Sequence, residues 1–191
     1  MIRASALIAA TLALSAPGLA MAQIAPEVGA SDTDSATVGV IGNVPAQCYG
    51  GTLSGDGSLD LGVLIDLTTG RLRTDLATPG EVLVGSFCTS RSTITVNATP
   101  LEAQNFTVAP PAGFSRRVHY LASASGWTTT PASYNTATAA NAAATQSRDS
   151  AFTGDITVAI SDFSTDGGET LRLVGDESYR GVVTVTLTAV N

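Results

Sequence analysis

Basic residues are scarce in this chain. Its 191 residues include no lysine, and nine arginines stand against sixteen aspartates and glutamates, which gives a net charge of −7. Proteins that bind nucleic acid or anionic lipid through their surface usually present a cluster of basic side chains. The nearest approach here is Arg116-Arg117, and a pair of this kind is typical of a solvated strand end. The composition therefore argues against a nucleic-acid or lipid partner.

Histidine, cysteine and aromatic residues are also few. The chain has one histidine, His119, two cysteines, Cys48 and Cys88, and 5% aromatic residues. A zinc site needs about four ligands, which one histidine and two distant cysteines do not supply. A nucleophilic cysteine or serine needs a base beside it, and no Gly-x-Ser-x-Gly sequence or histidine motif provides one. We therefore expect no enzyme, no cofactor and no metal site.

One acidic turn has part of a calcium-loop pattern. Asp56, Ser58 and Asp60 take the first, third and fifth positions of such a loop. The glycine and the glutamate that a calcium loop needs further along are missing. A turn that leads into a strand explains the sequence at least as well.

The N-terminal residues have the pattern of a secretory signal peptide. Arg3 precedes an apolar run over residues 4–16, and Ala20-Met21-Ala22 supplies the small residues of a cleavage site. The run is too short to span a bilayer as a helix. We expect residues 1–22 to be removed, the mature chain to have no membrane span, and the protein to be exported to the periplasm, the outer cell surface or the medium.

Export bears on the state of the two cysteines. In an oxidising compartment two cysteines usually pair, whereas in the cytosol they more often bind metal or do redox work. We therefore expect a disulfide between Cys48 and Cys88.

Apolar and polar residues alternate through much of the remaining chain. The alternation is clearest at residues 92–98, 155–163 and 182–190, and it indicates antiparallel strands with one buried face. Weaker strand candidates are residues 36–44, 58–65, 81–87, 105–109, 117–124 and 169–175. About seven to nine short strands separated by Gly- and Pro-rich turns predict a single all-β domain over residues 36–191, folded as a β-sandwich.

Two segments depart from this alternation. Residues 23–35 carry three acidic side chains and no strong pattern, and we expect a flexible arm there. Residues 123–147 are rich in Ala, Thr and Ser, and we expect a long surface loop with at most one helical turn. Trp127 and Tyr134 are its only large side chains and are candidates for contact with a sugar or a protein. For Trp127 we favour a place in the core, because the domain has few other large side chains.

The stretch from Cys48 to Leu101 resembles part of a known family. A strand ends at VPAQC, and LDLGVLIDLTTGRL, the strand EVLVGSFC and the strand STITVNATPL follow it. This order is similar to that of bacterial fimbrial subunits and the related spore coat protein U-type secreted proteins. In that group a cysteine after the first strand bonds to a cysteine that closes the next major strand. Cys48, Leu61-Gly62 and Cys88 occupy the corresponding places, and YRGVVTVTLTAVN, introduced by Tyr179, resembles the terminal strand.

The resemblance implies an immunoglobulin-like antiparallel β-sandwich and leaves open whether one strand is missing. Subunits of this kind are non-catalytic surface proteins of pili and adhesive structures, and each accepts a strand from a neighbour's N-terminal arm. The implied partners are copies of the chain, other surface subunits or a periplasmic chaperone. Candidate residues of the donated strand are Ile24, Val28, Ala30, Val38 and Val40.

A second hypothesis is a monomeric secreted binding module. Such a module is complete in its own strands and uses residues 123–147, with Trp127 and Tyr134, on a glycan or a protein. The two hypotheses differ in one structural feature, which is whether residues 182–190 close a finished sheet or border an open groove.

Overall fold

The computed structural model describes residues 35–168 and 170–190. The expected signal peptide and the candidate arm residues Ile24, Val28 and Ala30 lie outside the described residues. Residues 35–41 form one described segment with neither helix nor strand, and every residue in it is exposed. Gly42 begins the body of the protein, which contains all the strands of the described residues.

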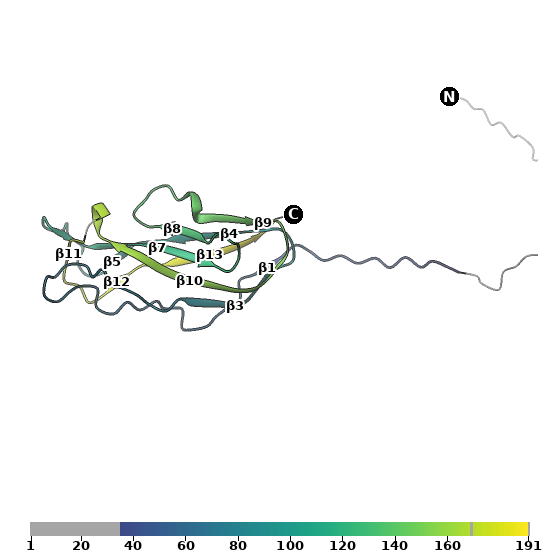
Figure 1. Cartoon of the computed structure of the whole chain (residues 1–191), viewed down its shortest axis with the longest axis horizontal. Helices are drawn as coiled ribbons and strands as arrows, with labels where there is room; N and C mark the ends of the chain where they lie inside the picture. The colour runs from purple at the N-terminus through teal and green to yellow at the C-terminus, as the bar shows by residue number, and fades with distance from the viewer. Residues whose placement is uncertain (1–34, 169, 191) are drawn as a thin grey trace, which may run out of the picture. The chain divides into compact units, whose positions relative to one another are not determined.

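The largest sheet of the body is antiparallel. Its strands run in the order β1-β3-β10-β7-β5-β12, with β2 beside β3 and β8 beside β7 (Figure 1). The bounds of these strands are β1 Cys48–Tyr49, β2 Thr52–Leu53, β3 Glu81–Cys88, β5 Leu101–Ala103, β7 Arg117–Ser125, β8 Ala132–Asn135, β10 Phe152–Ser164 and β12 Tyr179–Arg180.

Two smaller sheets complete the strands. One is antiparallel, in the order β13-β4-β9, and joins Val183–Ala189, Ser92–Ala98 and Thr145–Arg148. The other is a parallel pair of β6 (Phe114–Ser115) and β11 (Arg172–Leu173). The helices of the described residues are the short 3-10 turns η1 (Ala142–Ala144) and η2 (Asp166–Gly168), and neither has the length or the apolar character to cross a bilayer. The prediction of an all-β chain is confirmed.

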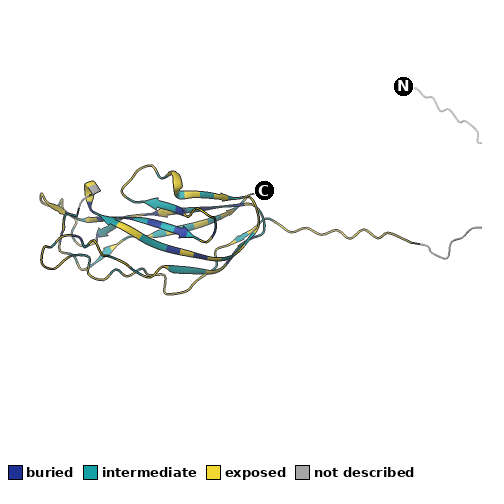
Figure 2. Ribbon diagram, viewed as in Figure 1, coloured by how far each residue is buried: buried dark blue, intermediate teal, exposed yellow. Residues whose placement is uncertain are grey.

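The main hydrophobic core takes side chains from both larger sheets. Ile94 and Val96 of β4, Tyr120 and Ala122 of β7, and Ile156 of β10 are all buried. Figure 2 shows buried segments in dark blue along the strands of the body. Each strand buries every second residue because successive side chains of a strand point to opposite faces. The period-two pattern of the sequence therefore indicated the buried face of these strands correctly.

A change of register in β10 explains one irregularity in that pattern. Ile156 and Val158 are buried, which places the even-numbered residues on the core face. Asp162 then adopts a positive φ of 53°, and the pairing of β10 with β7 shifts between Ser161 and Ser164. A bulge of this kind moves the following side chains to the opposite face, so Phe163 packs against the core despite its odd number.

Four of the weaker strand predictions are wrong in whole or in large part. Residues 36–44 and 105–109 form no strand, residues 58–65 contribute only an isolated bridge from Ile65 to Leu72, and residues 169–175 contain only the two residues of β11. In two of these segments, residues 58–65 and 105–109, a side-chain carboxylate rather than a neighbouring strand accepts backbone N–H groups. Asp60 accepts the backbone N–H of Gly62, and Asp176 accepts those of Asn105 and Phe106.

The expectation of one long loop at residues 123–147 is also wrong. Residues 132–135 form β8, which pairs with β7, and residues 145–148 form β9, which pairs with β4. The helical turn that we expected there is present as η1. Small residues hid these strands, because Ala and Ser have low strand propensity and their place in a sheet depends on the neighbouring strand.

Candidate functional site

Within the part of the chain that the structure describes, β13 pairs with a neighbouring strand along one edge only. It runs antiparallel to β4 over its whole length, from the pair Val183 and Ala98 to the pair Ala189 and Ser92. Among the described residues, no strand pairs with its other edge. An edge of this kind presents backbone N–H and C=O groups that can pair with another extended chain.

The hydrogen bonds at the two ends of β13 tell which residues face the open edge. The backbone N–H of Thr99 donates to Val182, and that of Val190 donates to Arg91, at 2.9 and 2.7 Å. In an antiparallel pair, both backbone groups of one residue point to the same side, and successive residues alternate. The even-numbered residues of β13 therefore bond to β4. The odd-numbered residues Val183, Val185, Leu187 and Ala189 direct their N–H and C=O groups to the open edge.

A groove lies beside this open edge. It has a volume of about 810 Å³ and takes its lining from β2, β3, β5, β7, β10, β12 and the first half of β13. The apolar side chains that line it include Leu53, Leu83, Leu101, Ile160, Val183 and Val185. An adjoining cavity of about 560 Å³ shares Ser58, Leu59, Leu101, Tyr179 and Arg180 with it and extends it to residues 60–65 and 173–178.

Apolar side chains on the walls of the groove remain partly open to solvent. Leu53 is 51% exposed and Val182 is 61% exposed. Sheets that bind a further strand use an unpaired strand edge for backbone hydrogen bonds and a neighbouring apolar groove for side chains, and this region has both features. The sequence did not reveal this groove, because its lining comes from segments that lie far apart along the chain.

Two tyrosines line the groove. The hydroxyl of Tyr120 donates to the carbonyl of Thr99 at 2.8 Å, and that of Tyr179 donates to the carbonyl of Val174 at 2.8 Å. Burial raises the pKa of each phenol to about 12, and for Tyr179 the negative charge of Asp176 adds to the effect. Both phenols therefore remain protonated at neutral pH. As hydrogen-bond donors they hold the backbone at Thr99 and at Val174 in place.

The charged side chains of the groove and its adjoining cavity, taken together, are mostly acidic. Glu81 and Arg180 line the groove itself, and the cavity adds Asp60, Asp176 and Glu177. Glu81 accepts the backbone N–H of Gly55 at 3.0 Å. An acidic lining favours a neutral or basic strand over an acidic one.

Asp176 holds together the chain next to β12. Its carboxylate accepts the backbone N–H groups of Ser178, Asn105 and Phe106 and the side-chain amide of Asn105, at 2.7–2.9 Å. These bonds, first of all the one from Ser178, lower the pKa of Asp176 from 3.8 to about 2. The ionised carboxylate thus ties residues 105–106 to the segment that leads into β13.

We expect Asp176 to make the protein less stable in acid. Because its pKa is lower in the folded than in the unfolded chain, its contribution is complete above about pH 4 and is lost as the pH falls towards 2. Melting temperatures of the wild type and of Asp176→Asn should differ at pH 5 and converge near pH 2. Curves that stay parallel over this range would contradict the assignment.

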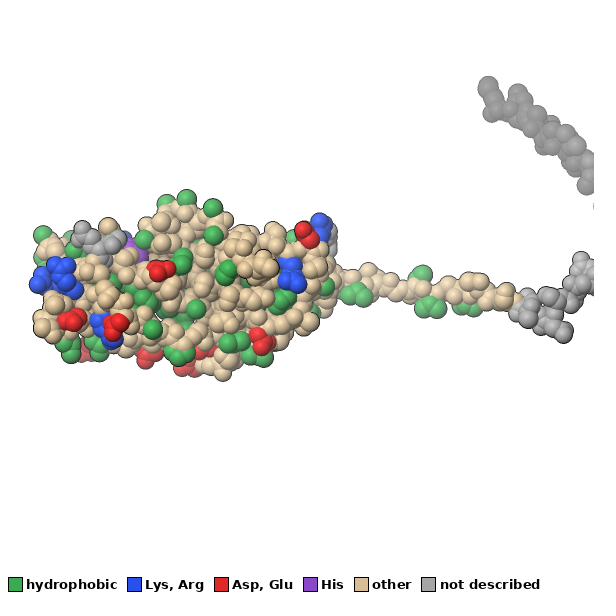
Figure 3. Space-filling view, in the orientation of Figure 1, with side chains coloured by type: hydrophobic (Ala, Val, Ile, Leu, Met, Phe, Trp, Pro, Cys, Tyr) green, Lys and Arg blue, Asp and Glu red, His purple; other side chains and the backbone are tan. Residues whose placement is uncertain are grey.

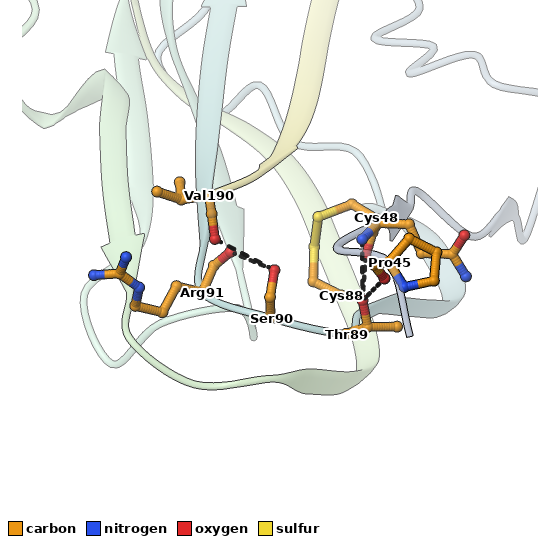
Figure 4. The surroundings of a disulfide bond; sticks show 8 residues. Pro45, Cys48, Cys88, Thr89, Ser90, Arg91 and Val190 are labelled. Carbon is orange, nitrogen blue, oxygen red and sulfur yellow. Dashed lines mark hydrogen bonds between the residues drawn. A yellow bond between two sulfur atoms is a disulfide. The ribbon is translucent and has the colours of Figure 1, made fainter. Parts of the chain in front are cut away.

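The disulfide expected from the sequence is present and joins Cys48 of β1 to Cys88 at the end of β3 (Figure 4). Thr89, the next residue, fastens the chain just before β1. Its hydroxyl donates to the carbonyl of Pro45 and accepts the backbone N–H of Gln47, both at 3.0 Å. Ser90 Oγ lies 3.4 Å from the carbonyl of Val190, to which it donates. Residues 88–90 therefore contact both the segment that follows the arm and the end of the last strand.

Two candidate residues of the donated strand, Val38 and Val40, are described. Their side chains are 81% and 94% exposed, and those of Ile41 and Val44 are 98% and 77% exposed. Residues 35–47 contain no charged residue. Figure 3 shows apolar side chains, and none that are charged, along this segment. These residues lie in no strand, so the sequence prediction of a strand at 36–44 is corrected, while the exposed apolar side chains remain available to a partner.

The two candidate contact residues of the binding-module hypothesis are not equally accessible. Trp127 is fully buried in the main core, where its ring centroid lies 4.3 Å from that of Phe152. Its proposed role as a ligand contact is therefore wrong, and the preference for the core is confirmed. Tyr134 of β8 is half-buried and packs against the same core. The structure does not bring these two side chains to one open surface.

His119 takes part in a polar cluster away from the groove. Its Nε2 atom lies 3.3 Å from Asp166, and Ser115 donates to the same carboxylate at 2.7 Å. The hydroxyl of Ser115 contacts the carboxylate rather than the imidazole, so His119 does not act on it as a base. The cluster joins β7 to η2 and β6.

Comparisons with protein-family models, with curated proteins and with solved structures found no match for this chain. The geometry of the groove and of the segment before β1 therefore carries the functional argument.

Proposed function

We propose that this chain is a non-catalytic exported surface subunit, of the fimbrial kind, that assembles by strand addition. Its body is an immunoglobulin-like β-sandwich that lacks one strand, and a strand from another copy or another surface subunit completes it. A periplasmic chaperone fills the same place before assembly. The observation that carries the proposal is the open edge of β13 next to an apolar groove.

The backbone and the side chains of β13 support one mode of binding. Val183, Val185 and Leu187 direct their free backbone groups to the open edge and pack their side chains against the core. An incoming strand that pairs with these backbone groups places alternate side chains between the same two sheets. Backbone pairing supplies affinity, and the apolar groove selects strands with alternating apolar residues.

The binding-module hypothesis has less support. It relied on Trp127 and Tyr134 in a surface loop, and the first is buried while much of that loop forms β8 and β9.

Gel electrophoresis in detergent, with and without boiling and with and without reductant, tests the proposal. We expect a ladder of the exported protein that survives detergent and collapses on boiling, because strand exchange buries many backbone bonds cooperatively. A single monomer band that shifts only on reduction would contradict strand addition.

Two proline variants test the role of the open edge. Val185→Pro removes an N–H that points to the open edge, so it should abolish the ladder and lower the melting temperature less than a proline whose N–H bonds to β4. Thr186→Pro is the matched control on the neighbouring residue. It removes an N–H that bonds to β4 and should lower the melting temperature more. If Val185→Pro still forms the ladder, β13 is not the acceptor strand.

A further inference from the structure

We infer that residues 36–44 of a second copy fill the groove, and that the acidic residues 23–35 remain outside it. This inference rests on the proposed function and names the segment that the groove accepts. The chain offers two stretches with apolar residues at alternate positions before β1, at 24–30 and at 36–44. Four properties favour residues 36–44: their lack of charge, the alternation of their apolar side chains, their length, and their position directly before the folded body.

Charge separates the two stretches. Residues 23–34 contain Glu27, Asp32 and Asp34, whereas residues 35–47 are uncharged. Four carboxylates and one arginine line the groove and its extension. An acidic strand that runs along the groove into the adjoining cavity meets an excess of carboxylates there, and the repulsion opposes its binding, whereas an uncharged strand avoids this repulsion.

In residues 36–44 the apolar side chains fall on alternate positions, so an extended strand would turn one apolar face towards the groove. Its even-numbered positions are all small or apolar, whereas the odd-numbered positions include Thr37 and Asn43; the even series is Ala36, Val38, Val40, Gly42 and Val44. Three of these side chains are at least 77% exposed in the isolated chain. Ile41 is the one large apolar residue of the opposite phase, and it therefore faces away from the groove in this register.

Length and attachment agree with this choice. Nine extended residues span roughly 30 Å, and the seven residues of β13 span roughly 24 Å, at about 3.4 Å per residue. The segment ends directly at Pro45, whose carbonyl accepts a hydrogen bond from Thr89. A donor at 36–44 therefore leaves almost no free linker between two subunits. A donor at 24–30 leaves more than ten residues of linker, and those include Asp32 and Asp34.

Two substitutions on adjacent residues and one deletion test the inference in the ladder experiment. Val40→Asp places a carboxylate on the face that enters the groove, and we expect it to reduce the ladder at least tenfold. Ile41→Asp adds the same charge one position later, on the outer face, and should leave the ladder within about twofold of the wild type. Deletion of residues 24–34 should also leave the ladder intact. Melting temperatures of the monomers verify that all variants fold.

The outcomes separate the inference from the proposed function. If the wild type forms a ladder and the deletion abolishes it while Val40→Asp does not, the donor lies at 24–30 and the inference is overturned, with strand addition intact. Equal effects of Val40→Asp and Ile41→Asp overturn the assigned phase. If the wild type forms no ladder, the proposed function fails and the inference fails with it.

Discussion

Replacing both Cys48 and Cys88 with alanine should lower the free energy of unfolding by about 4 kcal/mol. The disulfide closes a loop with a sequence separation of 40. Removing it gives the unfolded chain many more conformations, and the estimate follows from the entropy of closing a loop of that length. For a body of this size, the melting temperature should fall by roughly 8–16 °C.

The native structure adds a local effect to this loss. β1 and β2 are two residues long, and they hold residues 48–53 on β3 by few backbone bonds. Without the disulfide, these short strands can separate from β3 more readily. Protease cleavage between residues 45 and 54 should therefore increase in the double variant at temperatures where the rest of the body is still folded.

Urea unfolding, followed by circular dichroism, measures the predicted change. The wild type after reduction should unfold at the same urea concentration as the double-alanine variant, and this comparison separates the loss of the covalent bond from the loss of the sulfur atoms. A difference below about 1 kcal/mol between oxidised and reduced wild type would show that the bond does little for stability, against the estimate from loop closure.

The sequence indicated correctly those strands whose own residues alternate. β4, β10 and β13 could be recognised because apolar and polar residues alternate in their sequences, and in the structure alternate residues are less exposed than their neighbours along much of each strand. β8 and β9 could not be recognised, because their Ala, Ser, Thr and Gln residues show no alternation. These segments form strands because the fold places them beside β7 and β4. The same limit applies to the groove, since an open edge depends on which strands are absent beside β13.

Asp176 is a residue that sequence reasoning missed, although part of the signal was present. The spacing of Asp176 and Ser178 is typical of a turn in which the carboxylate accepts the N–H two residues on, and the structure contains that bond. The bonds to Asn105 and Phe106 join segments about seventy residues apart, and no local sequence pattern predicts them. The turn at Asp176 and Ser178 could therefore be predicted from the sequence, whereas the contact with residues 105–106 could not.

Trp127→Ala should destabilise the body by about 3–5 kcal/mol, because it removes the largest fully buried side chain of the core. The indole ring packs against Phe152, and the guanidinium of Arg148 donates to the Trp127 carbonyl at 2.7 Å and lies 5.0 Å from the centroid of the Phe152 ring. A cavity at this place also loosens the contact between β10 and the loop after β7. Urea unfolding measures the loss.

Trp127→Phe is the matched control. Within the described residues, the indole N–H has no hydrogen-bond partner, so phenylalanine loses ring volume but no hydrogen bond. It should therefore cost less than half as much as alanine. A phenylalanine variant as unstable as the alanine variant would show that the N–H has a partner on which the core depends.

The alanine variant also distinguishes the two functional hypotheses. Trp127 does not line the groove beside β13, so a folded fraction of Trp127→Ala, kept well below its melting temperature, should still form the ladder that resists detergent. A monomeric binding module should instead form no ladder in the wild type or in any variant. Loss of the ladder in Trp127→Ala, at a temperature where circular dichroism shows a native body, would mean that the cavity left by Trp127 disturbs the groove through side chains that the core and the groove share, such as Tyr120, Val183 and Val185.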